Sequence, residues 1–525
     1  VMSFDFSAIA SSFVESGIQH AFGVTGSGSS LRLIEALQGV GVSYFPTLHE
    51  SAAGLMAGAA CHDGSTRAVA VTIKGPGFAN LTPALLSNRY EGRPAISVSE
   101  AYAEDANAWQ AHKRLDHKAL CNSMVKGAIR LDANGASIAA LCRLARTEIP
   151  GPCHVDLAGS PAAPVADLEG PQETVTHDPL ATILRTIRKS RRPLVLLGSW
   201  ATRLLPAPDW NALTIPVVTT AAAKGVMDET GVFSAGVATG ESGELSPEAN
   251  LIPEADMVIA FGLRNREVIK ATPYHCPLVA IDAFGMESPG GFKPTHELVM
   301  PTAEDLTEVL NALGGYHWGE TEIAAWRERI RDRVLSDERQ AGNAFRVVEQ
   351  TLRRRNFEPR IVLDTGFFCT VGETIWRCRQ PGDYVGSAVG RYMGVSIPGA
   401  IGLSISDRDR PVVCAAGDGG IGSAIGELRL AVTERLPLLV LCFSDGGYGS
   451  VAAFSAPNPA IQRATEFADA TWWKVAAGLE MDSAMVSTPA GLSGQIEAWN
   501  PLDGPLFLQL AFDPIAYRDI ARQLR

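Results

Sequence analysis

Two aspartates that stand beside glycines are the residues whose types and spacing best suit chemistry. Asp418 follows the apolar run 411–416, and Asp445 follows the apolar run 438–443. Such runs predict buried strands, and a helical pattern lies between them. In an open α/β sheet, ligands bind beyond the carboxyl ends of strands, where glycines let the backbone approach an anion. A hard cation such as Mg2+ would relieve the repulsion between two carboxylates and a phosphate. The pattern therefore predicts a metal–diphosphate site, although an ordinary βαβ unit with acidic loops would share it.

The same residues resemble the diphosphate-binding signature of thiamine diphosphate (ThDP) enzymes. That signature has Gly-Asp-Gly, a gap and Asn-Asn; here Gly417-Asp418-Gly419 is followed by 24 residues and then Ser444-Asp445. Ser444 departs from the pattern at a position that is not a metal ligand in the family. The resemblance implies that Asp418, Asp445 and the carbonyl group of Gly447 bind Mg2+. It also implies cofactor contacts from Thr365, Gly366, Met393, Gly417, Gly419, Gly420 and Tyr448, with Met393 as the apolar residue that bends ThDP.

A glutamate near the N-terminus suits the other end of such a cofactor. Glu50 follows a predicted strand and opens a helix of small residues, where a carboxylate is often only a partner of the helix dipole. However, HESAAGLMAGAA and GPGFAN resemble the pyrimidine-binding domain of the acetolactate synthase, benzoylformate decarboxylase and pyruvate decarboxylase group. The resemblance implies that Glu50 stabilises the imino tautomer of the aminopyrimidine through a charge-assisted hydrogen bond. It also places Gly77 and Asn80 beside the cofactor.

Three polar residues between 102 and 126 are further candidates for catalysis. The resemblance places Gln110 at a cofactor-proximal glutamine of acetolactate synthase-like enzymes. His112 and His117 could be proton shuttles or anion contacts, and surface or capping roles fit the sequence equally well. The adjacent His–His pair of pyruvate decarboxylase-type enzymes is absent.

Two cations are candidates for binding the substrate. Lys74 precedes Gly75-Pro76-Gly77, and Arg391 lies two residues before Met393. If both side chains point into the cleft, they favour a 2-oxo acid with a second acidic group. Surface or interface ion pairs are the alternative, and these contribute little free energy.

The length of 525 residues suits about three domains. We expect an α/β fold of three doubly wound parallel-sheet domains: a pyrimidine-binding domain over 1–165, a central α/β domain over 180–335 and a diphosphate-binding domain over 341–525. Residues 160–180 and 316–355 are predicted to be linkers. No G-x-G-x-x-G is present in the central part, which favours a structural role there over nucleotide binding. The resemblance implies a homodimer or homotetramer, because the family's active site lies between subunits.

Composition excludes several classes of partner. The net charge is −12 without a long basic run, so we expect no binding to nucleic acid or to an anionic membrane surface. No apolar stretch approaches about 18 residues, and the first residues do not resemble a signal peptide. Nine scattered cysteines without C-x-x-C predict reduced thiols and a cytoplasmic protein.

The resemblance implies a ThDP- and Mg2+-dependent lyase or transferase that decarboxylates a 2-oxo acid through an enamine intermediate, with or without carboligation afterwards. An acetolactate synthase-like carboligase or a C–C lyase is the alternative, and Gln110 with the absent His–His pair favours the carboligase. A catalytically silent subunit with the same fold is the alternative outside catalysis, against which Glu50, Asp418 and Asp445 argue.

Overall fold

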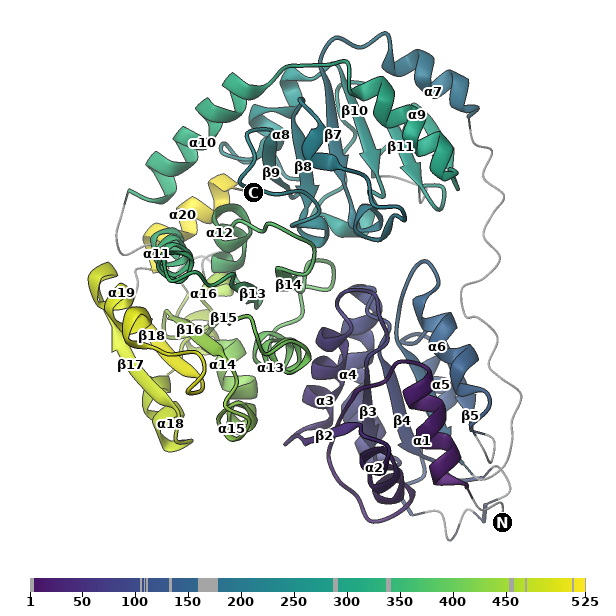
Figure 1. Ribbon diagram of the computed structural model, residues 1–525. Helices are drawn as coiled ribbons and strands as arrows, with labels where there is room; N and C mark the ends of the chain where they lie inside the picture. The colour runs from purple at the N-terminus through teal and green to yellow at the C-terminus, as the bar shows by residue number, and fades with distance from the viewer. Residues whose placement is uncertain are drawn as a thin grey trace.

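Three sheets organise the chain in the computed structural model, which describes residues 4–103, 106–107, 109, 112–131, 135–158, 178–286, 291–336, 341–452, 458–467, 470–511 and 514–524. Each sheet has six parallel strands with helices between them, and each belongs to a separate lobe (Figure 1). In each sheet the strand that comes second along the chain lies on one side of the first, and β3, β10 and β15 lie on the other side, so the three domains are doubly wound α/β units. The fold class expected from the sequence is confirmed.

The N-terminal domain is built on the strand order β2-β1-β3-β4-β6-β5. Its strands are β1 (His20–Gly23), β2 (Ser43–Pro46), β3 (Ala68–Thr72), β4 (Ile96–Glu100), β5 (Gly127–Arg130) and β6 (Cys153–Leu157). Its helices are α1 (Phe6–Glu15), α2 (Ser29–Gly39), α3 (Glu50–Ala60), α4 (Pro76–Tyr90), α5 (His117–Cys121) and α6 (Ile138–Arg146). Because β1 pairs in parallel with both β2 and β3, the loops that follow these strands meet at one edge of the sheet.

The central domain has the order β12-β11-β10-β7-β8-β9. Its strands are β7 (Pro193–Leu197), β8 (Val217–Thr220), β9 (Ser234–Ala238), β10 (Met257–Phe261), β11 (Leu278–Asp282) and β12 (His296–Val299). Its helices are α7 (Leu180–Ile187), α8 (Pro247–Asn250), α9 (Ala303–Leu313) and α10 (Glu320–Val334).

The C-terminal domain has the order β14-β13-β15-β16-β18-β17. Its strands are β13 (Arg360–Leu363), β14 (Tyr384–Gly386), β15 (Val412–Gly417), β16 (Leu438–Ser444), β17 (Asp482–Val486) and β18 (Leu506–Ala511). Its helices are α11 (Ala341–Arg354), α12 (Phe367–Ile375), α13 (Ser396–Ser406), α14 (Asp418–Ala424), the 3-10 turn η6 (Ile425–Glu427), α15 (Leu428–Thr433), α16 (Gly449–Ala452), α17 (Pro459–Thr465), α18 (Trp472–Gly478), α19 (Pro489–Ala498) and α20 (Pro514–Leu524).

Small residues let α3 pack closely against α13 of the third domain and α4 of its own domain. A methyl group added at Gly402 of α13 would lie 2.2 Å from the carbonyl oxygen of Met56 on α3, and one at Gly54 would lie 2.6 Å from Cβ of Ala84 on α4. At Gly402 the backbone of α13 therefore approaches the backbone of α3, which only glycine permits. The apolar cluster around α3 includes Phe22 of the first domain and Phe507 of the third, so one core joins the two domains.

Ion pairs and hydrogen bonds tie the central domain to both others. Glu148 of the first domain pairs with Arg203 at 2.7 Å and Arg264 at 2.9 Å. Lys224, which is buried, donates to the carbonyl oxygens of Glu373 and Trp376 in the third domain. Each domain therefore contacts the other two.

The start of α4 and the two predicted linkers can be compared with the structure. The helix α4 begins at Pro76, because proline is well suited to a first helical turn. The predicted linker 316–355 holds α10 and α11, whereas most of the linker 160–180 lies outside the described residues.

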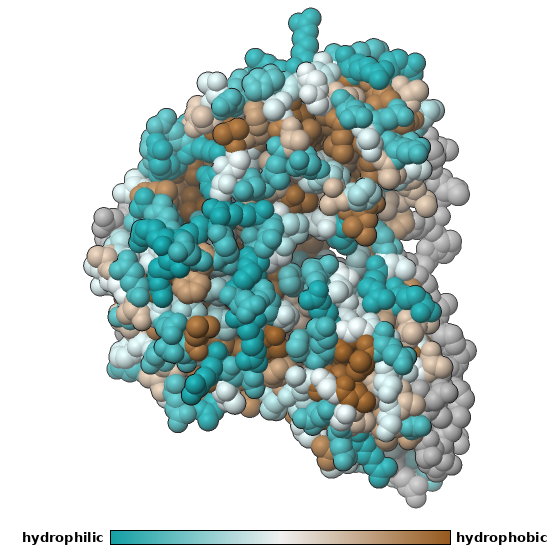
Figure 2. Space-filling view, viewed as in Figure 1, coloured by the Kyte–Doolittle hydropathy of each residue, from teal (hydrophilic) through white to brown (hydrophobic). Residues whose placement is uncertain are grey.

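The surface is mostly polar on the face that Figure 2 draws. Hydrophilic side chains cover most of this face, with separate hydrophobic areas between them. Within the described part of the chain, no helix has the length and apolar character needed to cross a bilayer. All nine cysteines lie in the described part of the chain, and eight of them are buried.

We expect Gly402→Ala to destabilise the protein by roughly 1–3 kcal/mol or more, because the new methyl group would push α13 away from α3. The measurement is the thermal unfolding midpoint, which should fall. Gly494→Ala is the matched control: this glycine also lies within a helix, and a methyl group there meets no atom within 4 Å. Equal midpoints for the two variants would contradict the packing argument.

Candidate active site

The turns that follow β15 and β16 lie side by side at the carboxyl edge of the third sheet. The strands pair in parallel as far as Gly417 opposite Phe443, so Asp418 and Asp445 follow at the same level. Asp418 is 1% exposed. Its Oδ2 accepts hydrogen bonds from the backbone N–H of Asp445 at 2.8 Å and of Gly446 at 3.0 Å. The Asp418 side chain therefore holds the turn after β16 through the backbone N–H groups of that turn.

Two side chains complete the surroundings of Asp418. Oδ1 accepts hydrogen bonds from the hydroxyl group of Ser444 at 2.8 Å and from the indole N–H of Trp472 at 2.7 Å. Ser444, the residue that departs from the family signature, thus orients the neighbouring aspartate. Trp472 was not expected at this site, and no sequence signal near Asp418 points to a residue so far along the chain.

Asp445 lies against Asp418 without a counter-charge among the described residues. Burial and the carboxylate of Asp418 raise the pKa of Asp445. Its Oδ1 accepts a hydrogen bond from the backbone N–H of Gly447 at 3.3 Å. Adjacent carboxylate oxygens that repel each other are the donor set that a hard divalent cation binds. The arrangement therefore fits Mg2+, with Asp418, Asp445 and Gly447 as the residues that could hold it.

Asp364 holds together the loop that follows β13 and the loop that precedes α13. It is fully buried at the end of β13 and accepts hydrogen bonds from the N–H of Thr365, Gly394 and Ser396. A methyl group on Gly420 would lie 2.8 Å from its carboxyl group, so only glycine fits there. Burial raises the pKa of Asp364. Sequence reasoning missed this role, although an acid directly after an apolar strand was the signal used for Asp418.

Met393 and Tyr448 flank the glycine turn. A methyl group on Gly419 would lie 2.8 Å from Sδ of Met393 and 2.7 Å from the ring of Tyr448. Met393 is 41% exposed, which is unusual for a large apolar side chain held beside a backbone turn. The structure thus brings together Gly419, Met393 and Tyr448, three residues expected to contact the cofactor. Part of the Met393 side chain remains exposed beside the turn.

Glu50 contacts the first turn of α4. It is the first residue of α3 and is 8% exposed. Its Oε2 accepts a hydrogen bond from the side-chain amide of Asn80 at 3.0 Å. Its Oε1 lies 3.4 Å from where a methyl group on Gly77 would be, so glycine leaves room beside this oxygen. The structure therefore brings Glu50, Gly77 and Asn80 together.

Within one chain, Glu50 is separated from the Asp418 turn. Leu48 and His49 donate backbone hydrogen bonds of 3.0–3.2 Å to Glu427, at the end of η6. Glu427 lies nine residues beyond Asp418 in the chain, with α14 and η6 between them. Burial raises the pKa of Glu427. The two groups of site residues thus lie at opposite ends of this helical segment.

Both candidate substrate cations are paired with carboxylates. Nζ of Lys74 lies 2.9 Å from Glu100, which also accepts hydrogen bonds from the N–H and hydroxyl groups of Ser30. Arg391 lies 3.2 Å from the buried Glu373, and this carboxylate raises the pKa of the guanidinium group. A contact of either cation with substrate stays a prediction, since each would have to exchange or share its partner.

The three catalytic candidates between 102 and 126 have different surroundings. Gln110 lies outside the described residues. His112 is exposed, and its backbone carbonyl accepts a hydrogen bond from Tyr102. His117 is buried and its Nδ1 lies 2.7 Å from Asp156, so its ring faces the domain interior.

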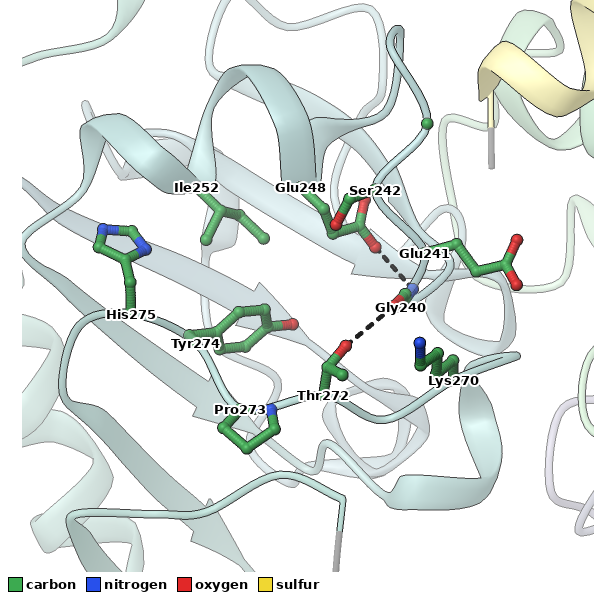
Figure 3. Close-up of a pocket in the computed structure, with 11 residues that line it drawn as sticks. Gly240, Glu241, Ser242, Glu248, Ile252, Lys270, Thr272, Pro273, Tyr274 and His275 are labelled. Atoms are coloured by element: carbon green, nitrogen blue, oxygen red, sulfur yellow. Dashed lines mark hydrogen bonds between the residues drawn. The ribbon is translucent and has the colours of Figure 1, made fainter.

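The central domain contains a pocket, which Figure 3 shows. It has a volume of about 550 Å³ and is lined by loops after β9 and β10 together with α8. Oε1 of Glu248 accepts hydrogen bonds from the N–H of Thr239 and Gly240, while its Oε2 and the hydroxyl group of Tyr274 are buried and have no hydrogen-bond partner among the described residues. Burial raises the pKa of Glu248 to about 7. The structural role expected for the central domain therefore stays a prediction.

Comparisons with known proteins agree with this geometry. The N-terminal TPP binding domain of thiamine pyrophosphate enzymes matches residues 6–120, and their C-terminal TPP binding domain matches residues 364–510. A catabolic acetolactate synthase from Raoultella terrigena is 25% identical over 546 residues, covering 97% of this chain and 95% of that protein. An acetolactate synthase from Bacillus subtilis (strain 168) is 23% identical over 96% and 92% of the two chains. A 2-hydroxyacyl-CoA lyase from Oryza sativa subsp. japonica is 22% identical over 99% and 97%.

We expect Glu248→Gln to stabilise the protein increasingly as the pH rises from 5 to 8. The folded state favours the protonated carboxyl group up to a pKa of about 7, so its stabilising contribution is complete below the unfolded pKa and is lost as the pH rises through the folded pKa. The amide mimics the protonated form, and the gain reaches at most about 3 kcal/mol. The measurement is the unfolding midpoint of variant and wild type at each pH.

The control for this experiment is Glu244→Gln, which changes an exposed glutamate of the same segment. A difference between Glu248→Gln and wild type that does not change with pH would contradict the assignment.

Proposed function

The chain belongs to the thiamine diphosphate-dependent enzyme family, and from this premise we propose that it cleaves a 2-oxo acid with release of CO2, using ThDP and Mg2+. The observation that carries the proposal is that two groups of candidate site residues contact one another, one group in the third domain and one in the first. Asp418 and Asp445 share one turn arrangement in the third domain, and Glu50 with Asn80 forms the other set in the first domain.

The residues of the third domain are suited to hold the diphosphate end of the cofactor. Asp418, Asp445 and the carbonyl group of Gly447 would bind Mg2+, and Gly419 and Gly420 keep the backbone free of side chains beside it. Met393, exposed above this turn, would support the cofactor on its apolar side. When bound, ThDP supplies a carbanion that adds to the carbonyl carbon of the substrate and stores the electron pair left by departing CO2.

Glu50 would control a proton on the cofactor ring. Asn80 occupies only Oε2, so Oε1 remains available beside Gly77. A hydrogen bond from a cofactor N–H to an ionised carboxylate contributes about 1.5–3 kcal/mol. The buried first turn of α3 limits water around this oxygen, which strengthens the interaction.

Lys74 is the candidate for recognising a second acidic group on the substrate. Its partner Glu100 is anchored to Ser30, so a substrate carboxylate would compete with Glu100 for the ammonium group. A 2-oxo acid with only one carboxylate requires no such exchange.

Carboligation is the second candidate outcome. Its support is the similarity to acetolactate synthases along nearly the whole length of both chains. The similarity to a 2-hydroxyacyl-CoA lyase keeps C–C bond cleavage of another substrate class as an alternative.

The first test combines the purified chain with ThDP, Mg2+ and a panel of 2-oxo acids, following CO2 and organic products together. We expect CO2 release, with aldehyde for a simple decarboxylase and a hydroxy ketone or acetohydroxy acid for a carboligase. Glu50→Gln should lower kcat by roughly 100-fold or more, because proton transfer at the cofactor depends on this carboxylate.

A matched control is Glu35→Gln, which changes an exposed glutamate of the same domain and should leave kcat unchanged. Binding of ThDP without turnover of any 2-oxo acid would favour a lyase for another substrate class or the catalytically silent subunit, and absence of ThDP binding would contradict the proposal.

The separation of Glu50 from Asp418 supports an assembly in which two chains complete each site. Exposed apolar side chains, which a second copy could cover, occur near both groups of residues: Leu48, Met393 and Val451. A homodimer, alone or within a homotetramer, would place Glu50 of one chain opposite the Asp418 turn of its partner.

Hybrid dimers test this arrangement. We expect Glu50→Gln and Asp445→Ala homodimers to be nearly inactive. A hybrid of the two chains, purified through two different tags, should regain about half of the wild-type activity, because one of its two symmetric sites is intact. A hybrid as inactive as its parents would show that each site lies within one chain.

A further inference from the structure

Two histidines share one carboxylate oxygen behind the first turn of α4. Nδ1 of His117 and Nε2 of His154 lie 2.7 Å and 3.1 Å from Oδ1 of Asp156. His154 and Asp156 alternate along β6, so they point to the same face of the sheet. His117 reaches them from the start of α5, and all three residues are buried. The donor atoms could belong to a metal site or to a hydrogen-bonded relay.

The remaining ring nitrogens favour the relay. The backbone N–H of Gly75 donates to Nε2 of His117 at 3.4 Å. A metal ion on Nδ1 would leave the ring proton on Nε2, where it would oppose the N–H of Gly75. When Nε2 accepts, the proton is on Nδ1 and is donated to Asp156. The geometry therefore points to a neutral His117 held in one tautomer.

The electrostatics agree with this assignment. Burial lowers the pKa of His154, which favours a neutral ring. Burial alone would raise the pKa of Asp156, but hydrogen bonds from His117 and His154 hold it below its usual range. The carboxylate thus stays ionised and accepts from both rings, while Nδ1 of His154 lies 2.8 Å from the hydroxyl group of Ser97.

The relay ends on the turn that carries the candidate site residues. Gly75 has φ +65°, and a methyl group there would lie 2.1 Å from the carbonyl oxygen of Lys113. The turn is therefore fixed in space as well as in conformation. Lys74 stands immediately before it, and Gly77, beside Glu50, stands two residues after it.

A ring contact holds the same helical turn at a second point. Phe78 stacks on His117 with ring centres 4.2 Å apart, and it contacts His154 at 4.5 Å. Two residues further along α4, Asn80 donates to Glu50. The cluster therefore holds α4 from behind at Gly75 and at Phe78, and the front of the same turn orients Glu50.

We propose that His117, fixed by Asp156 as the neutral Nδ1–H tautomer, is a positioning residue that keeps Asn80 on Glu50 through Gly75 and Phe78. The proposal rests on the proposed role of Glu50. His117 is thus neither a proton shuttle nor a substrate contact, because its two nitrogens are already engaged inside the domain.

The tautomer is measured first, by nitrogen NMR of the cofactor-free protein labelled with 15N-histidine. The resonances of His117 are assigned by their loss in His117→Gln. We expect a protonated Nδ1 and an unprotonated Nε2 that accepts a hydrogen bond. A protonated Nε2, or a shift of these resonances on adding Zn2+, would overturn the proposal. This measurement needs no turnover, so its failure is distinct from a failure of the proposed function.

Kinetics then test the effect on Glu50. His117→Phe keeps a ring against Phe78 but removes both hydrogen bonds, and we expect kcat to fall about 10- to 100-fold, since small displacements at a reacting centre have effects of this size. His117→Gln retains a donor and an acceptor and should recover most of this loss. In an Asn80→Ala background, His117→Phe should have little further effect, because both changes act on one contact.

The control is Cys142→Ala, which removes a buried side chain of the same domain from α6, in a different apolar cluster. It should lower the unfolding midpoint and leave kcat unchanged. Equal, additive losses from His117→Phe in both backgrounds, or a similar loss of kcat in Cys142→Ala, would overturn the positioning role.

Discussion

The packing of α3 between the first sheet and α13 is the constraint on which the candidate site depends. A helix can be covered on both sides at this distance only if its residues are small, and the contact of Gly402 with the backbone of Met56 shows how close the approach is. Because protein cores are close-packed, such an element cannot shift without opening the core. Glu50 is the first residue of this helix, so the position of its carboxylate follows from the packing of two domains rather than from a loop.

Carboxylates that are buried or half-buried hold the turns around this core. Asp418 holds the turn after β16, Asp364 holds the Gly394 turn, and Glu91 accepts backbone hydrogen bonds from three consecutive residues of the loop that begins at Ala388. Hydrogen bonds from N–H groups to ionised carboxylates are among the stronger polar contacts in proteins. In each case the turn that is held leads to a residue of the candidate site. Contacts within the chain thus fix the turns of the candidate site, and fixed polar groups are what electrostatic catalysis requires.

A buried carboxylate, Glu427, also separates the two groups of candidate site residues, Glu50 with Asn80 and Asp418 with Asp445. Glu427 attaches the entrance of α3 to the end of the helical segment that Asp418 begins, and this attachment keeps Glu50 away from the Asp418 turn of its own chain. The fold therefore separates residues that the proposed chemistry needs together, and assembly of two chains would resolve the conflict. The central domain contacts both others through Glu148 and Lys224, so it helps to set the angle between them.

The sequence by itself indicated the fold class, because continuous apolar runs such as 411–416 are typical of strands buried on both faces, and such strands need helices between them. It also indicated Asp418, Asp445 and Glu50, since their positions directly after strands depend only on neighbouring residues. Tertiary structure alone decided the partners of Lys74 and Arg391, the role of Asp364 and the inward orientation of His117. Those outcomes depend on contacts between residues far apart in the chain, and a linear pattern carries no information on which distant carboxylate will lie within hydrogen-bonding distance.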